Sequence, residues 1–335
     1  MRTWQKNVRD SLELLRKRIE DKGIPTNVVT EAIKNNPWFT PYFIHSAMKA
    51  ITPWLDGKSL DPFIQTYEYE YSPKKVGIIM AGNIPWVGMH DLILGILSGH
   101  DIIIKPSRQD RVLWDWFLME WRGMFPLLFH KLKVSESIPT SIDLLIATGS
   151  DNTARYFEFA YKDTSRVIRK NRYSIALVNR STTEGEWNAL AKDVFLYNGL
   201  GCRSVNNLLI EQGTDLSVWL DICKQYHAEY LSDWYMQKVA IERARLSMLG
   251  EKFINADKLL ILTGQELRNV SMGYLNCVFY QEEEKLDQYL HPLLSDIQCI
   301  VGKGTKFGKT QYPKINSFSD NVDTMKILTT LTMGK

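Results

Sequence analysis

The sequence predicts an α/β protein with two parallel-sheet domains and a helical segment at its N-terminus. Two observations carry this prediction. Beyond residue 72, short apolar runs alternate with segments of helical periodicity, which is typical of parallel sheets covered by helices. The chain also has 335 residues, which exceeds one ordinary compact core and suits two domains.

The first domain is expected to span residues 1–198 and to bind a dinucleotide. Residues 1–66 have helical periodicity, with breaks at Gly23-Ile24-Pro25 and at Asn36-Pro37. Buried strands are expected at 76–80, 101–105, 141–147 and 174–178. Helices are expected at 86–97, at about 110–122 and from about 151 onward.

A second alternating unit is expected to form a catalytic domain at 199–310, followed by a C-terminal return segment at 311–335. The change of pattern near 198–202 is the basis for this boundary. Its strands are expected at 208–211, 276–280 and 297–301. Its helices are expected at 215–230, 233–250 and 283–294.

The composition excludes several classes of protein. A net charge of +3, from 41 basic and 38 acidic residues, gives no reason to expect nucleic acid or a membrane surface as partner. No apolar run reaches the roughly 18 residues that span a bilayer, and the N-terminus lacks the apolar core of a secretory signal. The 4 cysteines form no C-x-x-C pair, which disfavours a disulfide framework or a metal site. A cytoplasmic protein is therefore expected.

Polar turns follow three of the expected strands, where parallel sheets bind their ligands. Gly82-Asn83-Ile84-Pro85 is either a plain turn or a source of an amide donor for a carbonyl oxygen. Lys105-Pro106-Ser107 is either a solvated strand end or a contact to the ribose or phosphate of a cofactor. Thr148-Gly149-Ser150 precedes an expected helix, which suits a pyrophosphate. Together the three turns favour a cofactor site.

The usual nucleotide fingerprints are missing. Gly308-Lys309-Thr310 is similar to the end of a phosphate loop, but Lys303 occupies the position that must be glycine five residues earlier. We therefore expect a surface turn there. No G-x-G-x-x-G occurs in the chain.

Gly199-Leu200-Gly201-Cys202-Arg203 is the strongest candidate for covalent chemistry. The glycines allow close approach of a substrate, and Arg203 together with an expected helix start would lower the pKa of the Cys202 thiol. An isolated cysteine is more often a small buried hydrophobe. The cysteines at 223, 277 and 299 lie in apolar patterns and are expected in the core.

These motifs occur in the order found in the aldehyde dehydrogenase superfamily. Over about residues 30–305 the sequence most closely resembles the long-chain acyl-CoA reductases, the fatty-acid reductase component of bacterial luminescence. Asn36-Pro37-Trp38-Phe39-Thr40 is also similar to that family. The resemblance implies an aldehyde dehydrogenase-like fold with two parallel-sheet, Rossmann-like domains. It also implies that the protein assembles as a homodimer or larger.

By this resemblance, Cys202 is the nucleophile that carries the acyl group. The Asn83 amide and the Cys202 backbone N–H would form the oxyanion hole. The residues implied in holding the nicotinamide dinucleotide are Lys105, Ser107, Thr148, Gly149 and Ser150.

Several departures from the wider superfamily refine the expectation. Residues 169–172, Arg-Lys-Asn-Arg, replace the Glu-Leu-Gly-Gly motif whose Glu activates water, so hydrolysis of an acyl-enzyme should be slow. Arg108 stands where many NAD-using relatives have an acid, which suits the 2′-phosphate of NADPH, with NADH as the alternative cofactor. Arg108 is equally open to interpretation as an exposed charge at a helix start. The Glu-Phe-Gly-Pro ribose clamp is missing, and the second domain is short.

The sequence thus predicts NADPH-dependent reduction of acyl-CoA, or of another activated acyl donor, to an aldehyde through Cys202. One alternative is a Cys202-dependent acyl transferase or thioesterase without reduction. Another is a non-catalytic subunit that binds an acyl-activating partner protein.

Overall fold

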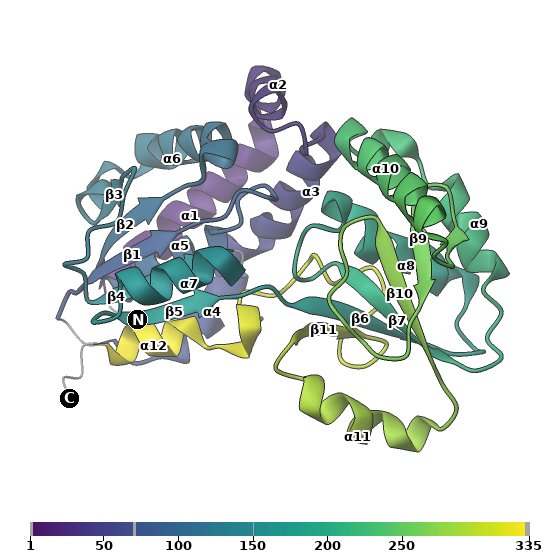
Figure 1. Ribbon diagram of the computed structural model, residues 1–335. Coiled ribbons are helices and arrows are strands. Elements are labelled where there is room, and N and C mark those ends of the chain that lie inside the picture. Colours follow the sequence, from purple (N-terminus) through teal and green to yellow (C-terminus); the bar gives the residue numbers. More distant parts are fainter. Residues whose placement is uncertain (1–2, 70–71, 150, 332–335) are drawn as a thin grey trace. The chain divides into compact units, whose positions relative to one another are not determined.

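The computed structural model describes residues 3–69, 72–149 and 151–331 (Figure 1). Its internal contacts divide the chain into two units. Unit 1 comprises Met1–Asn36, Ile44–Asn171 and Pro313–Lys335, and unit 2 comprises Pro37–Phe43 and Arg172–Tyr312. Two alternating α/β regions were expected, and the structure has one sheet in each unit. The main division falls at residues 171–172, upstream of the expected position at 198–199.

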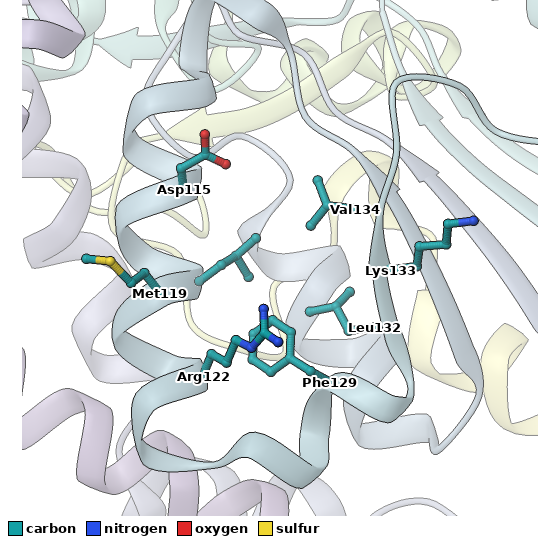
Figure 2. Close-up of a pocket in the computed structure, with 8 residues that line it drawn as sticks. Asp115, Met119, Arg122, Phe129, Leu132, Lys133 and Val134 are labelled. Carbon is teal, nitrogen blue, oxygen red and sulfur yellow. The ribbon is translucent and has the colours of Figure 1, made fainter.

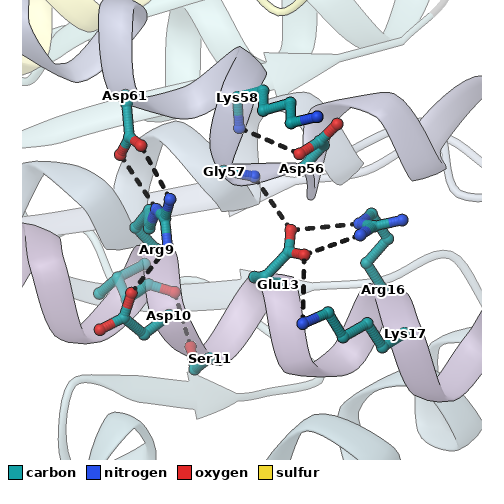
Figure 3. Close-up of polar contacts among 11 residues, drawn as sticks. Arg9, Asp10, Ser11, Glu13, Arg16, Lys17, Asp56, Gly57, Lys58 and Asp61 are labelled. Atoms are coloured by element: carbon teal, nitrogen blue, oxygen red, sulfur yellow. Dashed lines mark hydrogen bonds and ion pairs between the residues drawn. The ribbon is translucent and has the colours of Figure 1, made fainter.

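The N-terminal region is helical, with breaks at the predicted places. Gly23 has a left-handed φ of 65° and Asn36 is extended, so each ends a helix. Figure 3 shows how the first helix is tied to the fourth: Arg9 pairs with Asp61 at 2.8 Å, and the Gly57 N–H donates to Glu13 at 3.0 Å. The helices are α1 (Thr3–Lys22), α2 (Thr26–Asn35), α3 (Pro41–Ile51) and α4 (Gly57–Gln65).

Unit 1 contains a five-stranded parallel sheet with the order β3-β2-β1-β4-β5. Its strands are β1 (Lys75–Ile79), β2 (Asp101–Lys105), β3 (Leu132–Val134), β4 (Leu144–Thr148) and β5 (Ser165–Arg169). The predictions at 76–80, 101–105 and 141–147 correspond to β1, β2 and β4. The two edge strands, β3 and β5, were not predicted, because each is short or carries charged residues.

Side chains alternate across β1 and separate the two faces of this sheet. Gly77 faces Ile138 and Ile142, whereas Ile78 faces Gly95 on the opposite side. The helix α5 (Met89–Ser98) packs on β1 and β2 and is buried throughout, while α7 (Asp151–Ala160) packs on β4 and β5. The other helices of this unit are α6 (Arg111–Met124) and α12 (Thr324–Thr330), the latter packed on α5.

Unit 2 contains a six-stranded sheet with the order β11-β6-β7-β10-β9-β8. Its strands are parallel except for the β8–β9 pair. They are β6 (Tyr173–Val178), β7 (Val205–Glu211), β8 (Ile254–Asn255), β9 (Leu260–Thr263), β10 (Tyr274–Tyr280) and β11 (Ile297–Val301). The strand expected at 174–178 as the fourth of the first domain is β6, which instead pairs with β7 and β11.

The helices of unit 2 cover its apolar core. Thr183 and Glu186 form a capping box that starts the first of them. The segment expected as one helix at 283–294 contains only a five-residue α-helix, because Pro292 cannot donate a helical hydrogen bond. The helices are α8 (Glu184–Phe195), α9 (Ser217–Gln225), α10 (Asp233–Leu249) and α11 (Leu286–Leu290). In the described part of the chain, no helix has the length and apolarity that a membrane span requires.

Candidate active site

Three loops of unit 1 follow the carboxyl ends of β1, β2 and β4. These strands are neighbours in one parallel sheet, so the loops meet at the same edge. The loops contain Gly82-Asn83-Ile84-Pro85, Lys105-Pro106-Ser107-Arg108 and Thr148-Gly149, which are residues that the sequence singled out. The structure therefore places the described cofactor candidates, Lys105, Ser107, Arg108, Thr148 and Gly149, at the same edge of this sheet as Asn83.

The loops after β1 and β2 are in direct contact. A Cβ atom on Gly82 would lie 2.4 Å from Ser107 Oγ, so only glycine fits here. Asn36 is buried and its Nδ2 donates to the Gly82 carbonyl at 3.0 Å. These contacts fix the backbone on which Asn83 is exposed.

Asp110 joins the same two loops from inside the fold. Its side chain is 1% exposed, and its Oδ2 accepts the N–H of Trp86 at 2.8 Å. Trp86 has a left-handed φ of 54°, so this hydrogen bond stabilises a strained turn. The Asp110 N–H in turn donates to the Ser107 carbonyl at 3.2 Å. Burial raises the pKa of Asp110 well above its ordinary value. Asp110 was not predicted as a site residue, because nothing in the local sequence marks its burial.

The side chains after β2 are available to a ligand. Lys105 is half-buried and Arg108 is exposed. Neither side chain has a hydrogen bond or ion pair with any residue of 3–69, 72–149 or 151–331. Ser107 Oγ accepts from the Gln109 N–H at 3.3 Å and caps a short 3₁₀ turn, so its hydroxyl proton remains to be donated.

The loop after β4 has the predicted relation to a helix. Thr148 and Gly149 are half-buried, and α7 begins at Asp151. Ser150, which the sequence also selected, lies outside the described residues. Phosphate and ribose groups require hydrogen-bond donors and positive charge. This sheet edge offers a lysine, an arginine, a hydroxyl and the start of a helix. The residues present thus fit a dinucleotide.

Cys202 lies in unit 2, in the turn that leads into β7. Its side chain is half-buried, and its carbonyl accepts a hydrogen bond from Ser174 Oγ at 2.8 Å. The expected helix start is wrong, because the chain enters β7 at Val205. Arg203 Nη1 lies 3.4 Å from Cys299 Sγ, so this guanidinium is turned to the buried β11 sulfur.

The turn before Cys202 has an unusual backbone. Tyr197, Asn198 and Gly199 are consecutive left-handed residues, with φ of 58°, 56° and 70°. This conformation costs a non-glycine residue about 1–2 kcal/mol, although asparagine tolerates it better than most. A Cβ atom on Gly199 would also come within 3.3 Å of the Val194 carbonyl. Strain of this kind persists where the surrounding structure holds it, and it is frequent at active sites.

The remaining cysteines lie in the core, as predicted. Burial raises the pKa of Cys277 to about 12 and also raises the pKa of Cys223. Cys299 is 6% exposed. Within the described residues, no group of three or more His, Cys, Asp or Glu side chains is placed to hold a metal ion.

The phosphate-loop look-alike has a structural role. The buried carboxylate of Asp193 on α8 accepts hydrogen bonds from the Gly308 N–H at 2.6 Å and the Thr310 hydroxyl at 2.8 Å. The next residue, Gln311, donates to Ser204 Oγ at 3.1 Å. This segment is therefore a turn held by hydrogen bonds to Asp193, and it contacts the chain at Ser204, two residues after Cys202.

Residues 169–172 contain no carboxylate, and the first of them is already engaged. Arg169, at the end of β5, is buried and forms a bidentate ion pair with Asp91 of α5. Its Nη2 also donates to Thr324 Oγ1 of α12 at 3.0 Å. A water-activating base is thus missing from this stretch.

A groove of about 570 Å³ lies between α6 and the edge strand β3 (Figure 2). Arg122 lies over the ring of Phe129, 5.5 Å from its centre, and Lys133 points away from the groove. None of the sequence-predicted site residues lines it.

Part of the chain matches a known protein family, and the whole fold is similar to solved structures. The family model described as acyl-CoA reductase (LuxC) matches residues 56–219, a stretch that includes both Asn83 and Cys202. This stretch of the chain is similar to the acyl-CoA reductases. Solved aldehyde dehydrogenases have the same fold, which confirms the predicted aldehyde dehydrogenase-like architecture.

Three of these structures show the extent of the similarity. Aldehyde dehydrogenase 21 from Physcomitrella patens, solved with succinate, is 10% identical, with a TM-score of 0.68 over 95% of this chain and 79% of that one. The aldehyde dehydrogenase of Mycobacterium tuberculosis, solved with NAD+, is 13% identical, with a TM-score of 0.65 over 86% and 71%. The benzaldehyde dehydrogenase of Corynebacterium glutamicum is 13% identical, with a TM-score of 0.64 over 85% and 72%.

No curated protein matches the sequence significantly. The family match and the fold together support an oxidoreductase that acts on acyl or aldehyde groups.

Proposed function

We propose that this protein reduces an acyl thioester to the aldehyde through an acyl-enzyme on Cys202, with NADPH as the reductant. The observation that carries the proposal is the half-buried Cys202, which follows a strained turn inside the stretch that the acyl-CoA reductase model matches. Acyl-CoA is the proposed donor, and another activated acyl group would satisfy the same chemistry.

The proposed cofactor site is the loop edge of the unit 1 sheet. Lys105 and Arg108 would contact phosphate groups, and Ser107 and Thr148 would donate from their hydroxyls. Gly149, together with Ser150, would place the start of α7 beside the pyrophosphate. The exposed guanidinium of Arg108 favours a 2′-phosphate and hence NADPH, with NADH as the alternative. When bound, the cofactor would supply the hydride.

The chain's own residues would carry the acyl group. The Cys202 thiolate would attack the thioester carbonyl, and the C–S bond to coenzyme A would break, releasing its thiolate to be protonated. Asn83 Nδ2 and the Cys202 N–H would donate to the oxyanion, as the family resemblance implies. After hydride addition to the acyl carbon, the thiohemiacetal would collapse to free aldehyde and Cys202 thiolate. The overall reaction would convert acyl-CoA, NADPH and a proton into aldehyde, coenzyme A and NADP+.

The lack of a carboxylate at residues 169–172 supports reduction over hydrolysis. Activation of water by a positioned base contributes typically 10²–10⁴-fold to such a step. Without that base, the thioester on Cys202 would persist long enough to accept a hydride. Arg169 is also committed to Asp91 and Thr324, so this stretch serves the fold of unit 1.

The test is intact-mass analysis with a panel of acyl-CoAs of different chain length, with and without NADPH. The wild type should accumulate one acyl adduct without NADPH and release aldehyde with it. Cys202→Ala should form no adduct while still binding NADPH, and Cys223→Ala, a core cysteine variant, should behave as wild type. An adduct on Cys202→Ala would refute the nucleophile.

The other outcomes separate the rival functions. Free acid released equally with and without NADPH would indicate a thioesterase, and transfer to an added acceptor would indicate an acyl transferase. A wild type that forms no adduct with any donor would refute the proposal and favour a non-catalytic subunit of an acyl-activating partner. Size-exclusion chromatography with light scattering would test the proposed homodimer or larger assembly.

A further inference from the structure

The strained turn before Cys202 is held by the amide of Asn198. This side chain is 1% exposed. Its Nδ2 donates to the Trp38 carbonyl and to Ser232 Oγ, both at 3.0 Å, and its Oδ1 accepts the Ser232 N–H at 3.2 Å. Both amide protons are therefore used. An aspartate would have no proton for the Trp38 carbonyl, so this bond requires the amide.

The partners of Asn198 come from parts of unit 2 that are far away in sequence. Ser232 is the N-cap of α10, because its Oγ accepts the Tyr235 N–H at 3.2 Å. Trp38 belongs to Pro37–Phe43, the one N-terminal segment assigned to unit 2. The turn is therefore held through long-range contacts, whereas its own sequence provides only the Asn-Gly dipeptide.

Aromatic rings reinforce the same contacts. The ring of Tyr197 is 4% exposed and meets Phe43 edge to face at 5.5 Å. Tyr42 stacks on Tyr230 with the ring centres 4.4 Å apart. The segment Pro37–Phe43 thus packs against both the turn and the chain just before α10.

The held turn leads directly to the nucleophile. The Leu200 N–H donates to the Tyr197 carbonyl at 3.0 Å, which closes the turn, and the Ser204 N–H donates to the Gly201 carbonyl at 2.9 Å. Between these two bonds, the Cys202 carbonyl is fixed by Ser174 Oγ at 2.8 Å. The direction of the Cys202 side chain is set by the backbone on both sides of it.

We propose that Asn198 is a positioning residue for Cys202, and that it works by locking the left-handed turn onto Pro37–Phe43 and Ser232. This inference rests on the proposed function for its catalytic consequence. Asn198 touches no reacting atom in this assignment, and its effect passes through the orientation of the Cys202 backbone. A misplacement of about 1 Å can slow a reaction roughly 100-fold.

The three hydrogen bonds of the Asn198 amide to Trp38 and Ser232 are called the Asn198 clamp below. The variant that tests this inference is Asn198→Gly, because glycine accepts the left-handed backbone but cannot form this clamp. Ser232→Ala removes one acceptor of the same clamp and serves as an independent variant. Asn188→Ala is the matched control, since Asn188 is an exposed asparagine on α8 whose Nδ2 donates to the Glu184 carbonyl at 3.0 Å. Circular dichroism checks that each variant is folded.

Two readouts are compared. Single-turnover acylation of Cys202 by acyl-CoA should slow about 10- to 100-fold in Asn198→Gly, with an unchanged acyl-CoA concentration for half-maximal rate. Alkylation of Cys202 by iodoacetamide, followed by peptide mass, should instead become at least threefold faster, because the loosened turn exposes the half-buried thiol. Ser232→Ala should shift both rates in the same directions, and Asn188→Ala should match wild type.

The alkylation readout separates this inference from the proposed function. If wild type forms no acyl adduct but Asn198→Gly is alkylated at least threefold faster, the proposed function fails and the clamp on Cys202 stands. Alkylation of Asn198→Gly within threefold of the wild-type rate, or slower, would overturn the inference. Acylation of Cys202 in Asn198→Gly at the wild-type rate would overturn the inference as well.

Discussion

Replacing Asp110 by asparagine isolates the effect of one buried carboxyl group. The asparagine side chain has nearly the same shape and keeps a carbonyl oxygen for the Trp86 N–H, which Asp110 accepts at 2.8 Å. It cannot ionise. Any change in the pH dependence of stability therefore reports the titration of Asp110 itself.

The sign follows from the two pKa values of Asp110. In the unfolded chain it is close to 3.9, and burial in the fold raises it well above that. Between the two values, the folded state holds a proton that the unfolded state has lost. The free energy of unfolding of the wild type should therefore fall as pH rises through this window, by at most about 1.4 kcal/mol per pH unit.

Urea unfolding of wild type and Asp110→Asn at pH 5, 6, 7 and 8 measures this effect. The stability of the variant relative to wild type should grow with pH, by up to about 1.4 kcal/mol per unit, and level off above the folded pKa of Asp110. Asp115→Asn, at an exposed position on α6, should leave the pH dependence of the wild type unchanged. Parallel curves for wild type and Asp110→Asn would show that Asp110 is ionised in the fold, and would refute the reasoning.

Two further predictions concern the loops after β1 and β2. Asn83→Ala should lower kcat roughly 100-fold with little change in cofactor affinity, because one oxyanion donor is lost. Normal turnover by this variant would show that Gly82–Pro85 is a structural turn without a catalytic role. Arg108→Glu should weaken NADPH far more than NADH when both are titrated at one salt concentration, because the phosphate contact is screened by ions. Equal losses would mean that Arg108 does not contact the 2′-phosphate, and a wild-type preference for NADH would contradict the NADPH assignment.

Local patterns in the sequence were sufficient to predict the central strands of unit 1. β1 and β2 are apolar runs closed by a turn or by Pro106, and the structure confirms them within a residue. β5 was missed because Ser165–Arg169 has only two apolar residues, which lie between two arginines at a sheet edge. The sheet to which Tyr173–Val178 belongs could not be predicted, because strand pairing depends on Val205 and Ile297, which are far away along the chain.

The candidate site shows the same limit. Lys105, Ser107 and Arg108 could be selected because they follow a strand, and Cys202 because glycines flank it. The supporting side chains could not, since the roles of Asp110 and Asn198 arise from contacts with residues far along the chain. One signal was available in advance: Asn198-Gly199 is a dipeptide that favours left-handed turns.

The last part of the chain bears on how the protein folds during synthesis. Thr324 bonds the buried Arg169, and the Leu328 carbonyl bonds His100 at 2.8 Å, so α12 completes the interior of unit 1. Unit 2, in contrast, ends at Tyr312. The core of unit 1 is therefore incomplete until α12 has been synthesised and has docked, whereas unit 2 uses no residue beyond Tyr312. Until then Met325 and Leu328 are missing from the core, and the apolar surface of α5 that they cover is open to aggregation and to chaperones.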